Sequence, residues 1–117
     1  MNRTVKMLSA GLGVIGFVLA TMSVSAAVPD PTMIAAASSA ADHEAIAKAY
    51  DAEASSLEKM AAAHENLART YGQAGGKPWE RAQAKHCETI ASELTAAARQ
   101  ERALAAEHRK MAKMAGK

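Results

Sequence analysis

The sequence predicts an all-α fold, an antiparallel two-helix hairpin packed like an alanine-rich coiled coil, and three observations lead to it. Two long segments, about residues 40–71 and about 78–114, contain no internal helix breaker. A glycine-rich turn at residues 72–77 separates them. Within each segment the apolar residues recur at alternating spacings of three and four, which places them on one helical face. We therefore expect residues 39–117 to form one helical domain.

The first 27 residues read as a signal peptide. Arg3 and Lys6 form a short basic start, an uncharged apolar stretch follows, and small residues at 24–27 suit signal peptidase. The alternative is a retained membrane anchor, because residues 7–27 carry no charge and nearly span a bilayer. The small residues at the end of this stretch favour cleavage by signal peptidase. We therefore expect a periplasmic or secreted protein without stable membrane insertion.

The charge balance of the chain changes once the signal peptide is removed. Arg3 and Lys6 lie within it, so 12 basic and 12 acidic residues remain, and the net charge is zero before histidine is counted. A balanced chain of this kind has no excess of positive charge to attract phosphate backbones. We expect no nucleic-acid partner.

The ends of the two helices are marked by local signals. Residues 28–38, with two prolines and no periodic pattern, are expected to form a flexible, extended leader. Ser39 followed by Asp42 approximates a capping box at the start of the first helix. Pro78 suits the first turn of the second helix, where its missing N–H leaves no hydrogen bond unmade.

An eight-residue unit occurs four times, at residues 43–50, 64–71, 87–94 and 108–115. Its first position is histidine in three copies and cysteine in one, and its fifth position is always alanine. Within each helix the copies are 21 residues apart, which is three heptads, so both copies present the same face. The pattern indicates a duplicated helix whose seam alternates alanine with a larger residue.

The position of the turn predicts the register of the hairpin. If the turn is centred between Gly75 and Gly76, residues whose numbers add to about 151 should face each other. Histidine-containing layers should then lie at both ends, with leucines between them. The expected pairs are His43 with His108, His64 with Cys87, Leu57 with Leu94, and Tyr50 with Glu101.

The repeated unit and the His86-Cys87 pair resemble small exported bacterial proteins with two alanine-rich helices and regularly spaced histidines. The resemblance covers about residues 42–114. It implies an exported helical hairpin and carries no activity over.

Paired histidine and cysteine layers could bind a metal ion, because these residue types suit copper and zinc. Each layer supplies two or three ligands, whereas a closed tetrahedral site needs four, so a second copy of the hairpin would have to complete it. The candidate metal ligands are His43, His64, His86, Cys87 and His108.

Other interpretations of these residues stay open. Histidines at seam positions also act as structural polar layers that fix register. Cys87, the only cysteine, is either a small buried hydrophobic residue or an intermolecular link. A b-type haem held between two histidines and a chaperone-like envelope protein are further alternatives.

The expected function is a non-enzymatic structural or interaction module. The chain contains no nucleophile elbow, phosphate-binding loop or complete zinc-protease motif. Because alanine supplies most of the seam, one hairpin buries a thin core, and we expect it to form a homo-oligomer such as a dimeric four-helix bundle. The charged residues mostly indicate solvated helix faces, namely Glu53, Glu58, Lys59, Arg99, Arg102 and Lys110.

Overall fold

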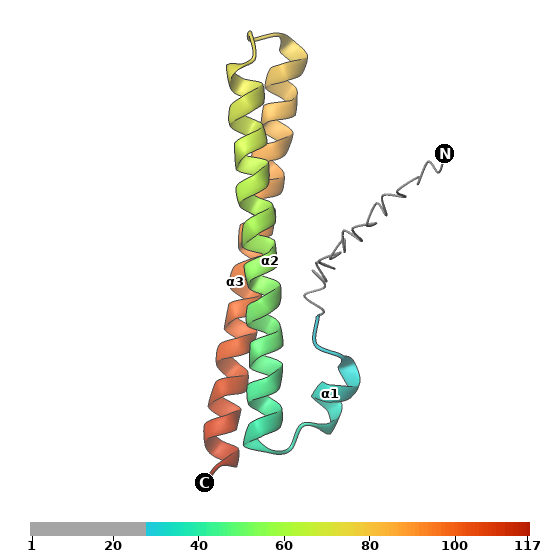
Figure 1. The fold of residues 1–117 in the computed structure, drawn as a ribbon, viewed down its shortest axis with the longest axis vertical. Helices are drawn as coiled ribbons and strands as arrows, with labels where there is room; N and C mark the ends of the chain where they lie inside the picture. Colours follow the sequence, from blue (N-terminus) through green and yellow to red (C-terminus); the bar gives the residue numbers. More distant parts are fainter. Residues whose placement is uncertain (1–27) are drawn as a thin grey trace, which may run out of the picture.

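The computed structural model describes residues 28–117, which form a short helix α1 (Pro31–Ala36) and two long helices, α2 (Ala40–Gln73) and α3 (Pro78–Ala115). The long helices run antiparallel and pack along their length, as Figure 1 shows. The predicted all-α hairpin is therefore confirmed. The predicted signal peptide lies outside the described residues. Over residues 28–117, no helix combines the length and apolar character that a membrane span requires.

The start of α2 is fixed by a reciprocal cap, as the sequence predicts. The backbone N–H of Asp42 donates to Ser39 Oγ, and the N–H of Ser39 donates to Asp42 Oδ2, both at 3.1 Å. The N–H of Ser38 also donates to Asp42 Oδ2. These bonds, the one from Ser38 first, hold the pKa of the Asp42 carboxyl below its usual value. Backbone donors that the helix leaves unpaired at its N-terminus thus find a partner.

The turn between the long helices depends on two glycines and a proline. Gly75 and Gly76 have φ values of 85° and 74°, a left-handed backbone that favours glycine. Pro78 then occupies the first turn of α3, and the N–H of Lys77 donates to Glu80 Oε2 at 2.8 Å. The chain therefore reverses direction within four residues of the end of α2.

Alanine forms the seam between α2 and α3. Nine alanines spaced by seven residues within each helix are all buried, none more than 9% exposed. Because alanine carries only a methyl group, it lets the two backbones approach closely and loses no side-chain entropy. The seam alanines are Ala47, Ala54, Ala61 and Ala68 in α2 and Ala84, Ala91, Ala98, Ala105 and Ala112 in α3.

The core built on this seam is thin. Among the described residues, Ile46 is the only large side chain that is fully buried. It forms a cluster with Ala47, Tyr50 and Ala105 near the free end of the hairpin, and Ala37 packs against that cluster. The seam residues Leu57, His64 and Leu94 are only half-buried, so one hairpin alone leaves much apolar surface in water.

The leader contains a helix that the sequence analysis did not expect. Residues 31–36 form α1 instead of an extended chain. Asp30 caps this helix by accepting a 2.8 Å hydrogen bond from the N–H of Thr32, and Pro31 pre-sets its first turn. α1 lies beside the start of α2 (Figure 1), where Met33 and Ile46 line the same small hollow. The cap at Asp30 and the contact with α2 explain why residues 31–36 are helical and not extended.

We expect Ala98→Leu to lower the free energy of unfolding by about 1–3 kcal/mol, because a larger side chain at the seam forces the helices apart. Ala103→Leu is the matched control, since Ala103 is exposed on the same helix. Urea unfolding followed by circular dichroism measures both variants. Equal effects of the two substitutions would contradict the close alanine seam.

Candidate functional site

His43 and His108 form a polar layer at the free end of the hairpin, with α2 supplying one ring and α3 the other. Their Nδ1 atoms lie 3.1 Å apart, and the ring centroids are 5.4 Å apart at an angle of 35°. His108 is buried and His43 is half-buried. The predicted facing of these two residues is therefore confirmed.

The contact between the two nitrogens restricts the protonation of the pair. A hydrogen bond between two Nδ1 atoms needs one donor and one acceptor, so at least one imidazole must be neutral. Burial, and secondarily the charge of His43, lowers the pKa of His108 below its usual value. The neutral form of His108 is thus favoured in the folded hairpin.

In the neighbouring layer, no hydrogen bond joins the side chains of Tyr50 and Glu101. The ring of Tyr50 leans toward His108, with centroids 5.7 Å apart. Side chains in a helix point toward its N-terminus, which brings Tyr50 over the histidine layer. Within the described part of the chain, Glu101 Oε2 is buried without a hydrogen-bond partner. Burial, and then the charge of Glu53, raises the pKa of Glu101.

The other predicted ligands are not gathered into one site. His64 is half-buried, and among residues 28–117 its Nδ1 is buried without a hydrogen-bond partner. Cys87 is buried as a free thiol. His86 is exposed, because the next residue of a helix points about 100° away from Cys87. Across the described residues, no group of three or more His, Cys, Asp or Glu is placed to hold a metal ion.

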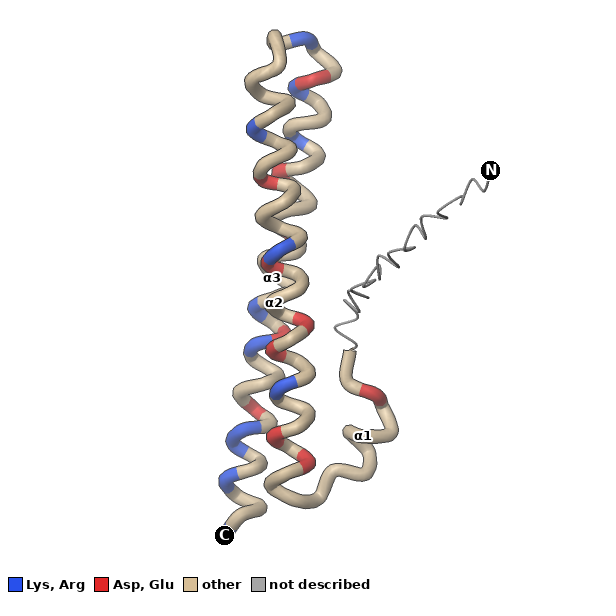
Figure 2. The backbone as a smooth tube through the Cα atoms, viewed as in Figure 1, with Lys and Arg blue, Asp and Glu red and all other residues tan. Residues whose placement is uncertain are grey.

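One edge of the hairpin carries an ion-pair ladder, by which we mean Asp51, Glu58, Arg102 and Arg109. Arg102 donates from Nε and Nη2 to the two carboxylate oxygens of Glu58, at 2.9 and 2.8 Å. Its Nη1 lies 3.5 Å from Asp51 Oδ1. Arg109 pairs with Asp51. The bonds from Arg102 lower the pKa of Glu58. Figure 2 shows basic and acidic residues alternating along the half of the hairpin away from the loop.

The ladder corrects the interpretation of Glu58 and Arg102 as merely solvated residues, because they join the two helices. They remain about half exposed, so water screens the pairs. The sequence did carry a signal: Asp51 and Glu58 are seven residues apart, as are Arg102 and Arg109. When acidic residues on one helix and basic residues on its antiparallel partner share the same seven-residue spacing, ion pairs between the two helices are expected.

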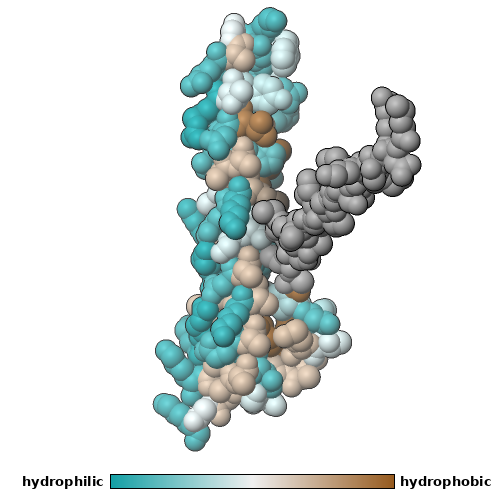
Figure 3. All heavy atoms as spheres, in the orientation of Figure 1, coloured by the Kyte–Doolittle hydropathy of each residue, from teal (hydrophilic) through white to brown (hydrophobic). Residues whose placement is uncertain are grey.

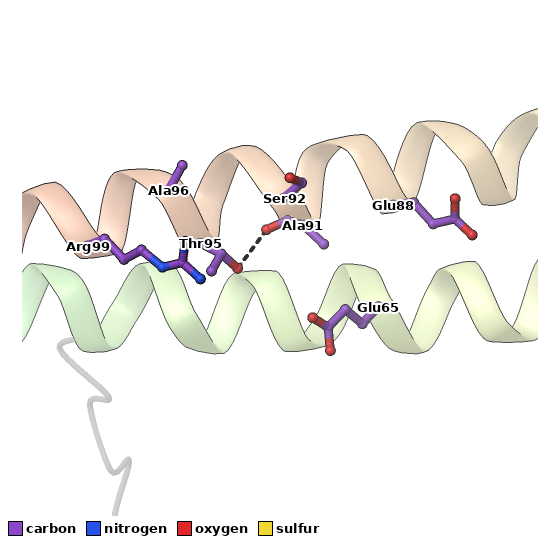
Figure 4. Close-up of a pocket in the computed structure, with 7 residues that line it drawn as sticks. All are labelled: Glu65, Glu88, Ala91, Ser92, Thr95, Ala96 and Arg99. Atoms are coloured by element: carbon purple, nitrogen blue, oxygen red, sulfur yellow. Dashed lines mark hydrogen bonds between the residues drawn. The ribbon is translucent and has the colours of Figure 1, made fainter.

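A surface hollow lies on the same edge, beyond the last rung. Seven residues past Glu58 on α2 is Glu65, and seven before Arg102 on α3 is Thr95, so a short uncharged side chain stands where an arginine would continue the ladder. Thr95 Oγ1 donates to the Ala91 carbonyl at 2.9 Å instead of reaching across (Figure 4). The hollow is lined by Glu65, Glu88, Ala91, Ser92, Thr95, Ala96 and Arg99.

The opposite edge of the seam is apolar. Five of the seven large hydrophobic side chains that α2 and α3 expose share one heptad position, and each is 36–49% exposed. We call these residues the apolar stripe. Figure 3 shows that hydrophilic residues gather along one side of the hairpin while more hydrophobic ones run along the middle of the visible face. The apolar stripe consists of Met60, Leu67, Ile90, Leu104 and Met111.

The heptad position of the apolar stripe adjoins that of the half-buried seam residues Leu57, His64 and Leu94. The sequence already indicates this second row, because the fourth position of the eight-residue unit is always a large apolar residue on the same helical face. Its signal is the spacing of apolar residues by sevens just outside the alanines. Together the two rows make a wide, mostly uncharged face. A hairpin that exposes such a face has a surface suited to another protein.

Comparison with family models, with curated proteins and with solved structures finds no match to this chain.

We expect the hairpin to lose stability as the pH falls from about 6.5 toward 5. The folded-state pKa of His108 lies below its unfolded value, so the unfolded chain takes up the proton first and acid favours unfolding. His108→Leu should flatten this dependence. Thermal melts between about pH 7.5 and pH 5 measure it.

His86→Leu is the control, because His86 is exposed and should leave the pH dependence unchanged. Glu101 acts in the opposite direction, since a raised pKa stabilises the fold at low pH and loses that contribution as the pH rises. The comparison between variants therefore isolates His108. Equal flattening by both histidine substitutions would contradict its role.

Proposed function

We propose that this protein is an exported, non-enzymatic interaction module that self-associates through its apolar stripe. Two hairpins packed on this face would form a four-helix bundle. The observation that carries the proposal is the segregation of the surface: the ion-pair ladder lies on one edge and the apolar stripe on the other.

The energetics of the hairpin support a partner on this face. The seam is filled by alanines, and Ile46 is the only large side chain fully buried in the described part. Burial of apolar area contributes about 25 cal/mol per Å², so a core of methyl groups provides little free energy for the ordering of two long helices. A second copy would bury Met60, Leu67, Leu104 and their neighbours. Small domains with thin cores commonly rely on oligomerisation for this reason.

The shape of the molecule supports a binding role over a catalytic one. The hollow at Glu65 and Thr95 is an open depression on the surface between two helices. Catalytic sites are usually concave and exclude water from the reacting groups. A flat helical face, by contrast, suits helix packing. The predicted signal peptide supports a location in the periplasm or outside the cell for this module.

We expect Leu104→Glu to dissociate the oligomer, because it puts a charge into the apolar face that a partner would desolvate. Ala103→Glu adds the same charge one residue away, outside the stripe, and should leave association unchanged. Sedimentation equilibrium at tens of micromolar protein measures both. A wild-type protein that stays monomeric there, or equal behaviour of the two variants, would contradict self-association.

Metal binding is a second candidate function, favoured by the geometry of His43 and His108. Zinc–nitrogen bonds of about 2.0–2.1 Å at a tetrahedral centre place two nitrogens about 3.3 Å apart. The observed 3.1 Å between the Nδ1 atoms is close to this value. Two ligands leave a tetrahedral site half complete, so a second hairpin would have to provide the others. Copper, which also accepts imidazole, is the alternative ion.

Titration with zinc or Cu(I) tests the second candidate. We expect a bound ion to stabilise the fold by about 2.7 kcal/mol at 100 times its dissociation constant, and chelator to reverse this. The double variant His43→Leu with His108→Leu should lose the effect, whereas His86→Leu should keep it. No thermal shift with either ion would contradict metal binding and leave the pair as a structural polar layer.

A further inference from the structure

Two polar atoms of the hairpin are left without partners. Over residues 28–117, the buried side-chain atoms with no hydrogen bond are His64 Nδ1 in α2 and Glu101 Oε2 in α3. Both side chains are half-buried at seam positions next to the apolar stripe, so the rest of each group reaches the surface. The charged neighbour that affects Glu101 is another carboxylate, Glu53. Unpaired buried polar groups cost free energy, which a partner could recover.

The two groups are placed symmetrically about one layer of the seam. Leu57 and Leu94, the predicted central layer, are both half-buried. His64 follows Leu57 by seven residues, and Glu101 follows Leu94 by seven. Because the helices are antiparallel, His64 lies about 10 Å toward the loop and Glu101 about 10 Å toward the free end.

We propose that two copies pack antiparallel on the apolar stripe, with a two-fold axis through the layer of Leu57 and Leu94. Glu101 of each copy then meets His64 of the partner subunit. This arrangement rests on the self-association proposed above and adds its orientation and register. A two-fold interface forms each contact twice, so one complementary pair satisfies both copies.

The chemistry of the pair fits this contact. An imidazole N–H donates to a carboxylate, and a charged acceptor makes the bond stronger than one between neutral groups. The same symmetry brings Leu104 of each copy to the level of Leu67 of the partner subunit, so apolar residues meet apolar residues.

The opposite orientation, with both loops at one end, is disfavoured by charge. It would stack the Glu101 layer of one copy on the Glu101 layer of the other, and Glu53 would add to the repulsion. That orientation is the one in which two His43–His108 pairs would meet, as a four-histidine metal site requires. The two arrangements are therefore distinguishable by which residues become neighbours.

Cysteine cross-linking in a Cys87→Ser background tests the arrangement. We expect His64→Cys and Glu101→Cys variants to form a covalent dimer when they are mixed and mildly oxidised, and to stay uncross-linked when oxidised separately. Within one chain the two positions are about 21 Å apart along the hairpin, far beyond the reach of a disulfide. Circular dichroism checks that each variant keeps its helices.

The outcomes separate this inference from the proposed function. Cross-linking of Glu101→Cys alone would show loops at one end and overturn the antiparallel arrangement. A dimer in sedimentation that cross-links in no combination would overturn the register. A monomer in sedimentation would overturn self-association itself, and with it this inference.

A charge exchange gives a second readout. We expect Glu101→Lys and His64→Glu each to raise the dimer dissociation constant about tenfold or more, and the two together in one chain to restore dimerisation, because opposite charges meet again. Failure of the combined variant to recover, with helicity intact, would contradict the contact between these positions.

Discussion

The close packing of two helices on alanine is the constraint on which the rest of this structure depends. A methyl group at each of nine seam positions lets α2 and α3 approach closely over more than thirty residues. Larger side chains cannot enter between the backbones at those levels. They occupy the seam positions between the alanines, where Leu57, His64 and Leu94 are half-buried, and the adjoining heptad position, where the apolar stripe is exposed.

Displacing the large side chains to one side gives the hairpin two different edges. On one edge, Arg102 bridges Asp51 and Glu58, and Arg109 joins Asp51, so charge links the helices there. On the other edge no comparable charge pairing connects the described residues, and apolar groups stand beside His64 and Glu101. The two edges therefore differ: one carries ion pairs between the helices and faces water, and the other is apolar and is the surface on which we propose that a second copy packs.

Polar groups at the seam set the register of such a helix pair. Alanine is uniform along the seam, so a shift by one heptad would cost little in packing alone. The contact between His43 and His108 penalises that shift, because it would leave a buried imidazole unpaired. Glu80, which holds the N–H of Lys77 beside the two glycines of the turn, limits the shift at the other end. Hydrogen bonds at the two ends thus set the register of the hairpin. The small size of the seam alanines sets the close spacing of the helices along its length.

The sequence alone specifies the two helices, their turn, the cap at Ser39 and the facing of His43 with His108. These follow from local rules, namely capping, glycine geometry and heptad spacing, which act within a few residues or repeat regularly. The helix α1 escaped sequence analysis because contact with α2 supports it as well as its own cap. Only the tertiary structure decided that Arg102 bridges two acids and that Tyr50 leans on His108. The unpaired buried atoms of Glu101 and His64 are likewise seen only in the tertiary structure. Whether such an atom finds a hydrogen-bond partner depends on how far its side chain reaches across the narrow seam.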